Sequence, residues 1–148
     1  MPKKTIIFDV DGTLADIWHR RKFLEQVNPD WKSFNEKMGD DTPNAPIVEL
    51  YKTLWDTGKY NIVITSGRSE KDRKITEQWL VWNEIPFENL EMRQDNDNRA
   101  DYIIKEEILK KLIAEGRDIL FVVDDRQQVV DMWRRNGIHC LQCDTGDF

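Results

Sequence analysis

Short runs of β-branched and aromatic residues recur along the chain, and each run predicts a buried strand. Such runs lie at residues 5–9, 60–65, 90–93, 118–123 and 138–142. Between them, apolar residues recur at helical spacing, which predicts helices buried on one face. These helices are expected at residues 46–57, 70–83, 101–114 and 127–136. The alternation predicts an α/β fold, a Rossmann-like parallel sheet of about five strands with helices on both faces.

The helix expected at residues 70–83 shows how core positions are assigned from this pattern. Its apolar side chains recur at helical spacing, and Ile85-Pro86 ends it. The side chains expected to face the core are Ile75, Trp79, Leu80 and Trp82.

Residues 16–44, which follow the first strand, have a helical pattern with an uneven apolar face. One helix is expected from Ala15 to about Val27, although a basic cluster at residues 19–22 interrupts its apolar positions. We expect a small helical flap over the site, inserted in a single domain of residues 1–148.

A second short helix is expected within this flap. Asn28-Pro29 ends the first helix, and Asp30 is suited to cap the next one. That helix is expected to carry its apolar positions as far as Met38, and residues 39–44 are expected to be a plain linker.

The composition predicts a soluble globular chain. Charged residues make up 34% and hydrophobic residues 39% of the 148 positions, and no apolar run approaches the roughly 20 residues that span a bilayer. No segment resembles a signal peptide, so a cytoplasmic location and no membrane partner are expected. The net charge of −6 argues against a broad nucleic-acid-binding surface, although a local basic pocket for a strand end is compatible with it. Nothing in the sequence indicates the oligomeric state.

The cysteines Cys140 and Cys143 are close together near the end of the chain. A structural zinc site would need a second cysteine pair, which the sequence lacks. We expect two reduced, partly buried thiols.

Polar residues that carry chemistry follow three of the predicted strands. They are Asp9 and Asp11, then Ser66-Gly67-Arg68, then Asp124-Asp125. Ligands of open parallel sheets bind beyond the carboxyl ends of the strands. We therefore expect these residues to converge on one crevice, where Lys105 joins them from a helix that begins near the same edge.

Each of these features has an ordinary explanation when it is taken alone. An acidic pair at the start of a loop is usually solvated, Asp124-Asp125 suits a helix N-terminus, and a lysine on an amphipathic helix is usually exposed. Their joint occurrence, in order and at three strand ends, indicates a phosphoryl-transfer centre. Carboxylates crowded in this way require a divalent cation or a bound proton.

In the same order, four segments resemble the four motifs of the haloacid dehalogenase-like phosphatases. The segments are residues 9–13, residues 65–68, Lys105 and Asp124-Asp125. The resemblance covers the whole chain and implies the fold of that superfamily.

A closer resemblance is to the 3′-phosphatase domains of bacteriophage polynucleotide kinases. It is carried by residues 11–15, 66–68, 105–108, 124–126, 129–135 and 146–148. The Gly-x-x-x-x-Gly-Lys-Ser/Thr phosphate loop of a kinase does not occur in the sequence. The resemblance implies that Arg20, Arg68 and Asp101 are site residues.

The acidic residues have distinct expected roles. Asp9 is the expected nucleophile, which forms an aspartyl-phosphate, and Asp11 is the expected acid and base. An acid that works near neutral pH needs a raised pKa, which the charge of Asp9 favours. Mg²⁺ is the expected cofactor, and its expected ligands are Asp9, the backbone carbonyl of Asp11 and one of Asp124 and Asp125, without a choice between the two.

The transferred phosphate needs hydrogen-bond donors and positive charge. The residues expected to hold it are Thr13, Arg20, Ser66, Gly67, Arg68 and Lys105. Arg20 and Arg68 suit forked contact with its oxygens, and Lys105 is also expected to be catalytic. Asp101 lies one helical turn before Lys105 and is expected to pair with its ammonium and orient it.

These residues predict a Mg²⁺-dependent phosphomonoesterase that removes 3′-terminal phosphate from polynucleotides, as in nucleic-acid end processing or repair. One alternative is the same chemistry on free nucleotides or other small phosphate esters, and another is a phosphomutase-type transfer. A noncatalytic binding module is disfavoured because none of the expected carboxylates, serine or lysine of the site is missing.

A base of the substrate can stack on an aromatic ring. The candidate rings are those of Trp18, Trp31, Phe34 and Trp133. Helical spacing assigns most of them to the core.

Overall fold

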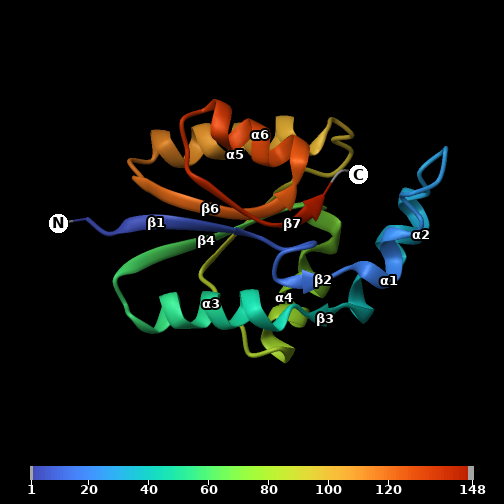
Figure 1. Cartoon of the computed structure of the whole chain (residues 1–148), viewed down its shortest axis with the longest axis horizontal. Coiled ribbons are helices and arrows are strands. Elements are labelled where there is room, and N and C mark those ends of the chain that lie inside the picture. Colours follow the sequence, from blue (N-terminus) through green and yellow to red (C-terminus); the bar gives the residue numbers. More distant parts are fainter. Residues whose placement is uncertain (1, 147–148) are drawn as a thin grey trace.

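A five-stranded parallel sheet forms the centre of the molecule in the computed structural model, which describes residues 2–146 (Figure 1). The last two positions of the segment 146–148 lie outside the described residues. In spatial order the strands are β5 (Asn89–Arg93), β4 (Tyr60–Ser69), β1 (Lys4–Asp9), β6 (Ile119–Arg126) and β7 (Cys140–Gly146). β1 pairs in parallel with β4 on one side and with β6 on the other. The three strands that carry the predicted site are therefore neighbours, and the predicted fold class is confirmed.

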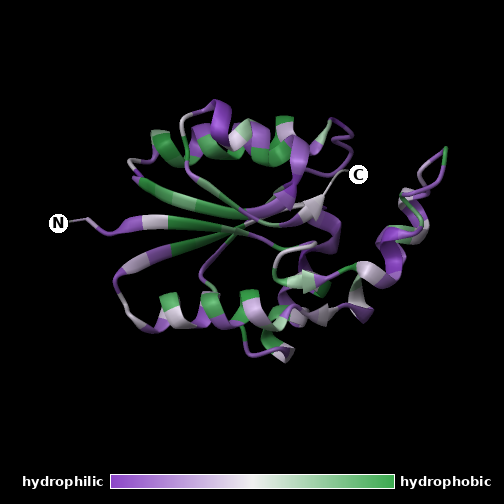
Figure 2. Ribbon diagram, viewed as in Figure 1, coloured by the Kyte–Doolittle hydropathy of each residue, from purple (hydrophilic) through white to green (hydrophobic). Residues whose placement is uncertain are grey.

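Helices cover both faces of the sheet (Figure 1). One face carries α3 (Ala45–Asp56) and α4 (Arg73–Trp82), and the other carries α5 (Asp101–Ala114) and α6 (Gln127–Arg135). Successive strand side chains point to opposite faces, so Phe8 belongs to the first core and Ile7 to the second. Figure 2 shows this apolar interior along the strands and more polar residues toward their carboxyl ends.

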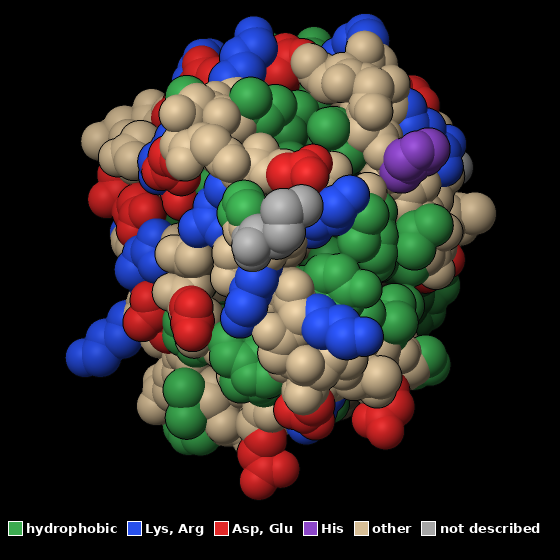
Figure 3. Space-filling model, turned by 90° about the vertical axis from the view of Figure 1, so that its left-hand side faces the viewer, with side chains coloured by type: hydrophobic (Ala, Val, Ile, Leu, Met, Phe, Trp, Pro, Cys, Tyr) green, Lys and Arg blue, Asp and Glu red, His purple; other side chains and the backbone are tan. Residues whose placement is uncertain are grey.

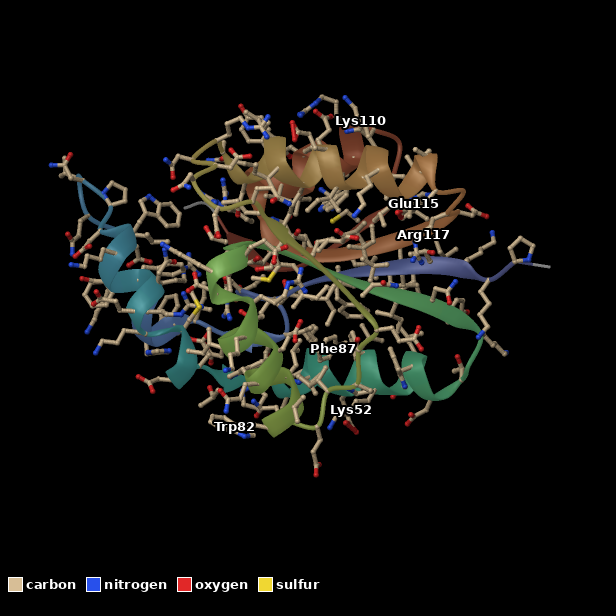
Figure 4. All side chains as sticks on the ribbon, turned by 180° about the vertical axis from the view of Figure 1, so that it is seen from behind. Lys52, Trp82, Phe87, Lys110, Glu115 and Arg117 are labelled. Atoms are coloured by element: carbon tan, nitrogen blue, oxygen red, sulfur yellow. The ribbon has the colours of Figure 1, made fainter. Side chains whose placement is uncertain are left out.

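The inward face of α4 differs from the prediction. Trp79 and Leu80 are buried as expected, but Ile75 is 39% and Trp82 71% exposed, and Figure 4 shows Trp82 on the outer side of the helix. The buried arc includes Thr76, whose hydroxyl accepts a hydrogen bond from Arg68 Nη1 (3.0 Å). The apolar pattern assigned the wrong edge of the helix because a polar residue occupies part of its buried face.

The first half of the flap departs most from expectation. The helix expected from Ala15 to Val27 is replaced by a short strand, β2 (Ala15–Asp16), and a single helical turn, α1 (Trp18–Arg21). The basic cluster lies on this turn, where Arg20 is fully buried and reaches inward to carboxylates rather than into solvent.

The second half of the flap is partly as predicted. Asp30 caps the helix α2 (Trp31–Glu36) by accepting a hydrogen bond from the Ser33 amide. The expected linker is structured instead: after the 3₁₀ turn η1 (Met38–Asp40), the strand β3 (Thr42–Pro43) pairs antiparallel with β2. The flap lies at the end of the sheet where the strands finish (Figure 1).

Cys140 and Cys143 are free thiols, and burial raises the pKa of each to about 12, so both stay protonated at neutral pH. Figure 3 views the opposite end, where the strands begin, and shows acidic, basic and apolar side chains interspersed. Within residues 2–146, no helix has the length and apolar character that crossing a membrane requires.

Candidate active site

Two glycines allow acidic side chains to approach the carboxyl ends of the strands. Gly12, in the turn after β1, has a φ of +82°, and a Cβ there would lie 2.0 Å from Oδ2 of Asp125. A Cβ on Gly67 would lie 2.1 Å from Oδ1 of Asp101. Each glycine therefore makes room for a carboxylate that a larger residue would displace.

A buried lysine joins two carboxylates at the floor of the site. Lys105 Nζ donates to Asp9 Oδ1 (2.7 Å) and to Asp124 Oδ2 (3.0 Å). Thr13 Oγ1 donates to the other oxygen of Asp9 (2.9 Å). All four residues are buried, so both oxygens of Asp9 are held in fixed positions.

Burial and mutual repulsion perturb the acidic groups of this centre. Burial and the charge of Asp124 raise the pKa of Asp9 well above its usual range and raise the pKa of Asp125 to about 7. Burial lowers the pKa of Lys105, but the carboxylates of Asp124 and Asp9 outweigh it, so the net shift is upward and the ammonium stays charged. The centre therefore retains protons at near-neutral pH unless another cation replaces them.

The carboxylates of Asp9, Asp124 and Asp125 fit a magnesium ion. One oxygen from each lies within 4.8 Å of the others, so all three can reach a single ion. All three are hard oxygen donors, the type that this ion prefers. The Asp11 carboxylate is not part of the cluster.

Asp11 is held by two arginines. Its Oδ1 accepts hydrogen bonds from Arg20 Nη2 (2.5 Å) and Arg68 Nη2 (2.6 Å). Burial raises the pKa of Asp11, but the charges of Arg68 and Arg20 outweigh it and hold that pKa below its usual range. The expectation of a raised pKa at Asp11 was wrong, because Arg20 and Arg68 each place a positive charge against its carboxylate.

Asp41, which was not predicted to belong to the site, has a completely buried side chain. It accepts hydrogen bonds from Arg20 Nε (2.8 Å) and Nη2 (2.7 Å) and from Arg68 Nη2 (3.1 Å). His19 Nε2 lies 2.7 Å from Asp41 Oδ1. The only signal in the sequence was the basic cluster of the flap, since a buried arginine requires a countercharge.

Asp101 has different partners from those expected. Its carboxylate accepts hydrogen bonds from Arg93 Nη2 (2.7 Å) and Arg126 Nη1 (3.2 Å), whereas Lys105 bonds to Asp9 and Asp124. The charge of Asp101 still helps to raise the pKa of Lys105. Asp101 thus influences Lys105 through space and organises two arginines that were not predicted.

A pocket of about 550 Å³ opens over this centre. Its floor includes Asp9, Lys105 and Asp124, and its walls include Arg68, Gly67 and residues of α2 and of the loop after β5. Among the described residues, Thr13, Arg20 and Ser66 do not line it. Ser66 Oγ accepts a hydrogen bond from the Arg68 amide (3.0 Å).

Known proteins resemble this chain in sequence and in fold. The profile of the polynucleotide kinase PNKP phosphatase domain family matches residues 3–148. A chain of the Pnkp1/Rnl/Hen1 RNA repair complex superposes with a TM-score of 0.83 at 34% identity, over 99% of this chain and 44% of that one. The class C acid phosphatase of Bacillus anthracis, solved with tungstate bound, shares the fold, with a TM-score of 0.69 at 13% identity over 99% of this chain and 68% of that one.

A viral relative is also similar. It comes from Autographa californica nuclear polyhedrosis virus, and its assigned name, bifunctional polynucleotide kinase/RNA ligase, is provisional. The two are 26% identical over 132 residues, which is 88% of this chain and 18% of the relative. The chain thus spans less than half the length of this relative and of the repair-complex chain. It is a phosphoric monoester hydrolase with a haloacid dehalogenase-like fold, and it belongs to the family of polynucleotide kinase PNKP phosphatase domains.

Proposed function

We propose that this phosphatase removes the 3′-terminal phosphate of a polynucleotide, in a Mg²⁺-dependent reaction that passes through an aspartyl-phosphate on Asp9. The observation that carries the proposal is the buried Asp9–Lys105–Asp124 centre at the floor of a pocket, in a chain of this family. Processing of nucleic-acid ends is the corresponding biological role.

In the first step, a carboxylate oxygen of Asp9 attacks phosphorus and the bond to the 3′ oxygen breaks. The leaving oxygen takes a proton from Asp11. In the second step, water attacks the aspartyl-phosphate, its proton passes to Asp11, and Asp9 is released together with inorganic phosphate. Lys105 and Arg68 balance the negative charge that the phosphoryl group carries through both steps.

The arginines around Asp11 control its protonation state. Before substrate binds, Arg20 and Arg68 hold Asp11 ionised, which suits a base but not an acid. A phosphate that draws Arg68 toward itself weakens that hold, and Asp11 then gains the proton that it donates.

Asp9, Asp124 and Asp125 are the residues that would hold Mg²⁺. When bound, the ion supplies positive charge to the phosphate oxygens and orients the group for in-line attack. Among the described residues that line the pocket, seven are acidic and five are basic, so a cation offsets an excess of negative charge before an anionic substrate enters.

Three substrates test the proposal in parallel: a 3′-phosphorylated oligonucleotide, a 3′-mononucleotide and a 5′-mononucleotide. We expect the highest kcat/KM on the oligonucleotide, in DNA or RNA form, and activity that requires Mg²⁺. The RNA arm is included because a solved relative belongs to an RNA repair complex. Asp9→Asn is expected to abolish hydrolysis of all three substrates while the circular dichroism spectrum stays unchanged.

The outcomes separate the alternatives. A preference for either mononucleotide would overturn the polynucleotide assignment in favour of a nucleotide phosphatase. Activity that survives in Asp9→Asn would overturn the aspartyl-phosphate mechanism itself.

A further inference from the structure

The active-site pocket has an aromatic wall, although its floor is almost entirely ionic. Trp31 and Phe34, both from α2, line the pocket together with the catalytic carboxylates. Phe34 is buried, whereas Trp31 remains 45% exposed. A phosphate group gains nothing from an exposed indole, so this wall is suited to another part of a substrate.

Contacts on the flap hold the indole in place. The Phe34 ring meets Trp31 edge to face, with ring centroids 5.6 Å apart. The Arg20 guanidinium lies 4.2 Å from the centre of the Phe34 ring, and its Nη1 donates to the Phe34 carbonyl (3.2 Å). The arginine that binds Asp11 thus also positions the aromatic wall.

Another arginine, Arg126, approaches Trp31 from the body of the molecule. Cζ of Arg126, at the end of β6, lies 5.7 Å from the centre of the indole. Arg126 follows Asp125 directly and donates to Asp101 (3.2 Å), and it lines the same pocket. The Arg126 guanidinium therefore lies over the ring of Trp31, and the flap supplies the indole while the sheet supplies the guanidinium.

We propose that Trp31 and Arg126 form a stacking platform for a nucleobase of the substrate, and that this platform makes the enzyme selective for nucleotide ends over phosphate esters without a base. The proposal rests on the proposed function. Bases stack on aromatic side chains and on guanidinium planes regardless of sequence. The pocket volume of about 550 Å³ lies within the range of roughly 300–1,000 Å³ found for pockets that enclose small molecules, which leaves room beyond the phosphate.

A second exposed tryptophan on the flap provides a matched control. Trp18 is 68% exposed and has the Arg21 guanidinium 5.1 Å from its ring centre. It lines a separate, smaller hollow of about 220 Å³ rather than the active-site pocket. The two tryptophans share exposure, flap location and an arginine neighbour, and they differ in which pocket they line.

The test compares Trp31→Ala, Trp31→Phe and Trp18→Ala on two 3′-phosphorylated oligonucleotides, one with all its bases and one abasic at its last two positions. We expect Trp31→Ala to lower kcat/KM for the intact end by about tenfold or more, mainly through KM. The same variant should leave the abasic end nearly unchanged. Trp31→Phe should recover most of the loss, and Trp18→Ala should match the wild type.

Fluorescence quenching in a binding experiment measures stacking directly. In an Asp9→Asn background, a fluorescent purine at the terminal or penultimate position should be quenched on binding, and Trp31→Ala should remove that quenching. Equal losses of kcat/KM on intact and abasic ends would overturn the platform and indicate a merely structural role for Trp31. No loss on either end would also overturn the platform. If the wild type prefers a 5′ end, the 3′-end assignment fails, and the same comparison of base-bearing with base-free esters still decides the platform.

Discussion

At the scale of single residues, Asp41 connects groups that the proposed chemistry uses without taking part in it. Its buried carboxylate binds both guanidinium groups that reach Asp11, those of Arg20 and Arg68. Its backbone carbonyl accepts a hydrogen bond from Trp79 Nε1 (2.8 Å), which fixes it to α4. Asp41 therefore sets where the positive charge of the site lies.

Replacing Asp41 tests this positioning role. Asp41→Asn keeps the size of the side chain but leaves two buried arginines short of a countercharge, so we expect kcat to fall on the order of 100-fold. The free energy of unfolding should fall by about 3 kcal/mol. Steady-state kinetics and chemical denaturation measure the two effects. Asp40→Asn, at the exposed neighbouring position, is the control, and an unchanged kcat in Asp41→Asn would contradict the role.

The convergence of Asp9, Lys105 and Asp124 could be predicted from the sequence because their signals are local. Asp9, Ser66 and Asp124 each follow an apolar run, and the sheet topology brings such ends together. The pKa of Asp11 and the role of Asp41 depend on contacts with residues far away in the chain, Arg20 and Arg68. No spacing rule indicates which buried carboxylate a given arginine will reach.

At the scale of elements, the sheet follows from local sequence signals, whereas the flap depends on contacts between residues that are far apart in the chain. The strands and the four long helices follow from apolar periodicity, and α5 occupies the predicted residues 101–114. The flap is built from short segments that ion pairs and a two-stranded ribbon hold in place. Apart from α2 and its Asp30 cap, the structure of the flap could not be predicted, because those interactions depend on the completed site.

The cap of α2 offers a test of how firmly the flap is ordered. Asp30 accepts hydrogen bonds from the Ser33 amide (3.1 Å) and hydroxyl (2.7 Å). Asp30→Ala removes both, and we expect amide hydrogen exchange in residues 31–36 to become about fivefold faster. Asp30→Asn retains an acceptor and serves as the control. Equal acceleration in the strands of the sheet would show that the flap does not open independently.

At the scale of the whole molecule, the buried acidic centre links stability to pH and to Mg²⁺. Burial and Asp124 raise the pKa values of Asp9 and Asp125, the latter to about 7. Between their usual range and the raised values, the folded state binds more protons than the unfolded state, so stability falls as pH rises through that window. The lowered pKa of Asp11 acts only in more acidic solution.

Thermal unfolding checks this linkage. In the presence of a chelator, we expect the Tm to decrease between about pH 5 and about pH 8. Excess Mg²⁺ should stabilise the protein most at the higher pH, because the ion requires deprotonated carboxylates. Asp125→Asn should reduce the slope that is measured in the chelator. A Tm that rises with pH without Mg²⁺ would contradict the shifted pKa values.

The central position of β1 has a consequence for how the chain folds. Phe8 lies beside Ile64 of β4 on one side and beside Val123 of β6 on the other. During synthesis, β1 can pair with β4 early, but its other edge stays open until β6 has left the ribosome, and an open apolar edge favours aggregation. The strand that closes this edge also delivers Asp124 and Asp125, so β1 becomes covered on both sides at the stage at which these two carboxylates join Asp9, while the outer edge of β6 stays open until β7 pairs with it.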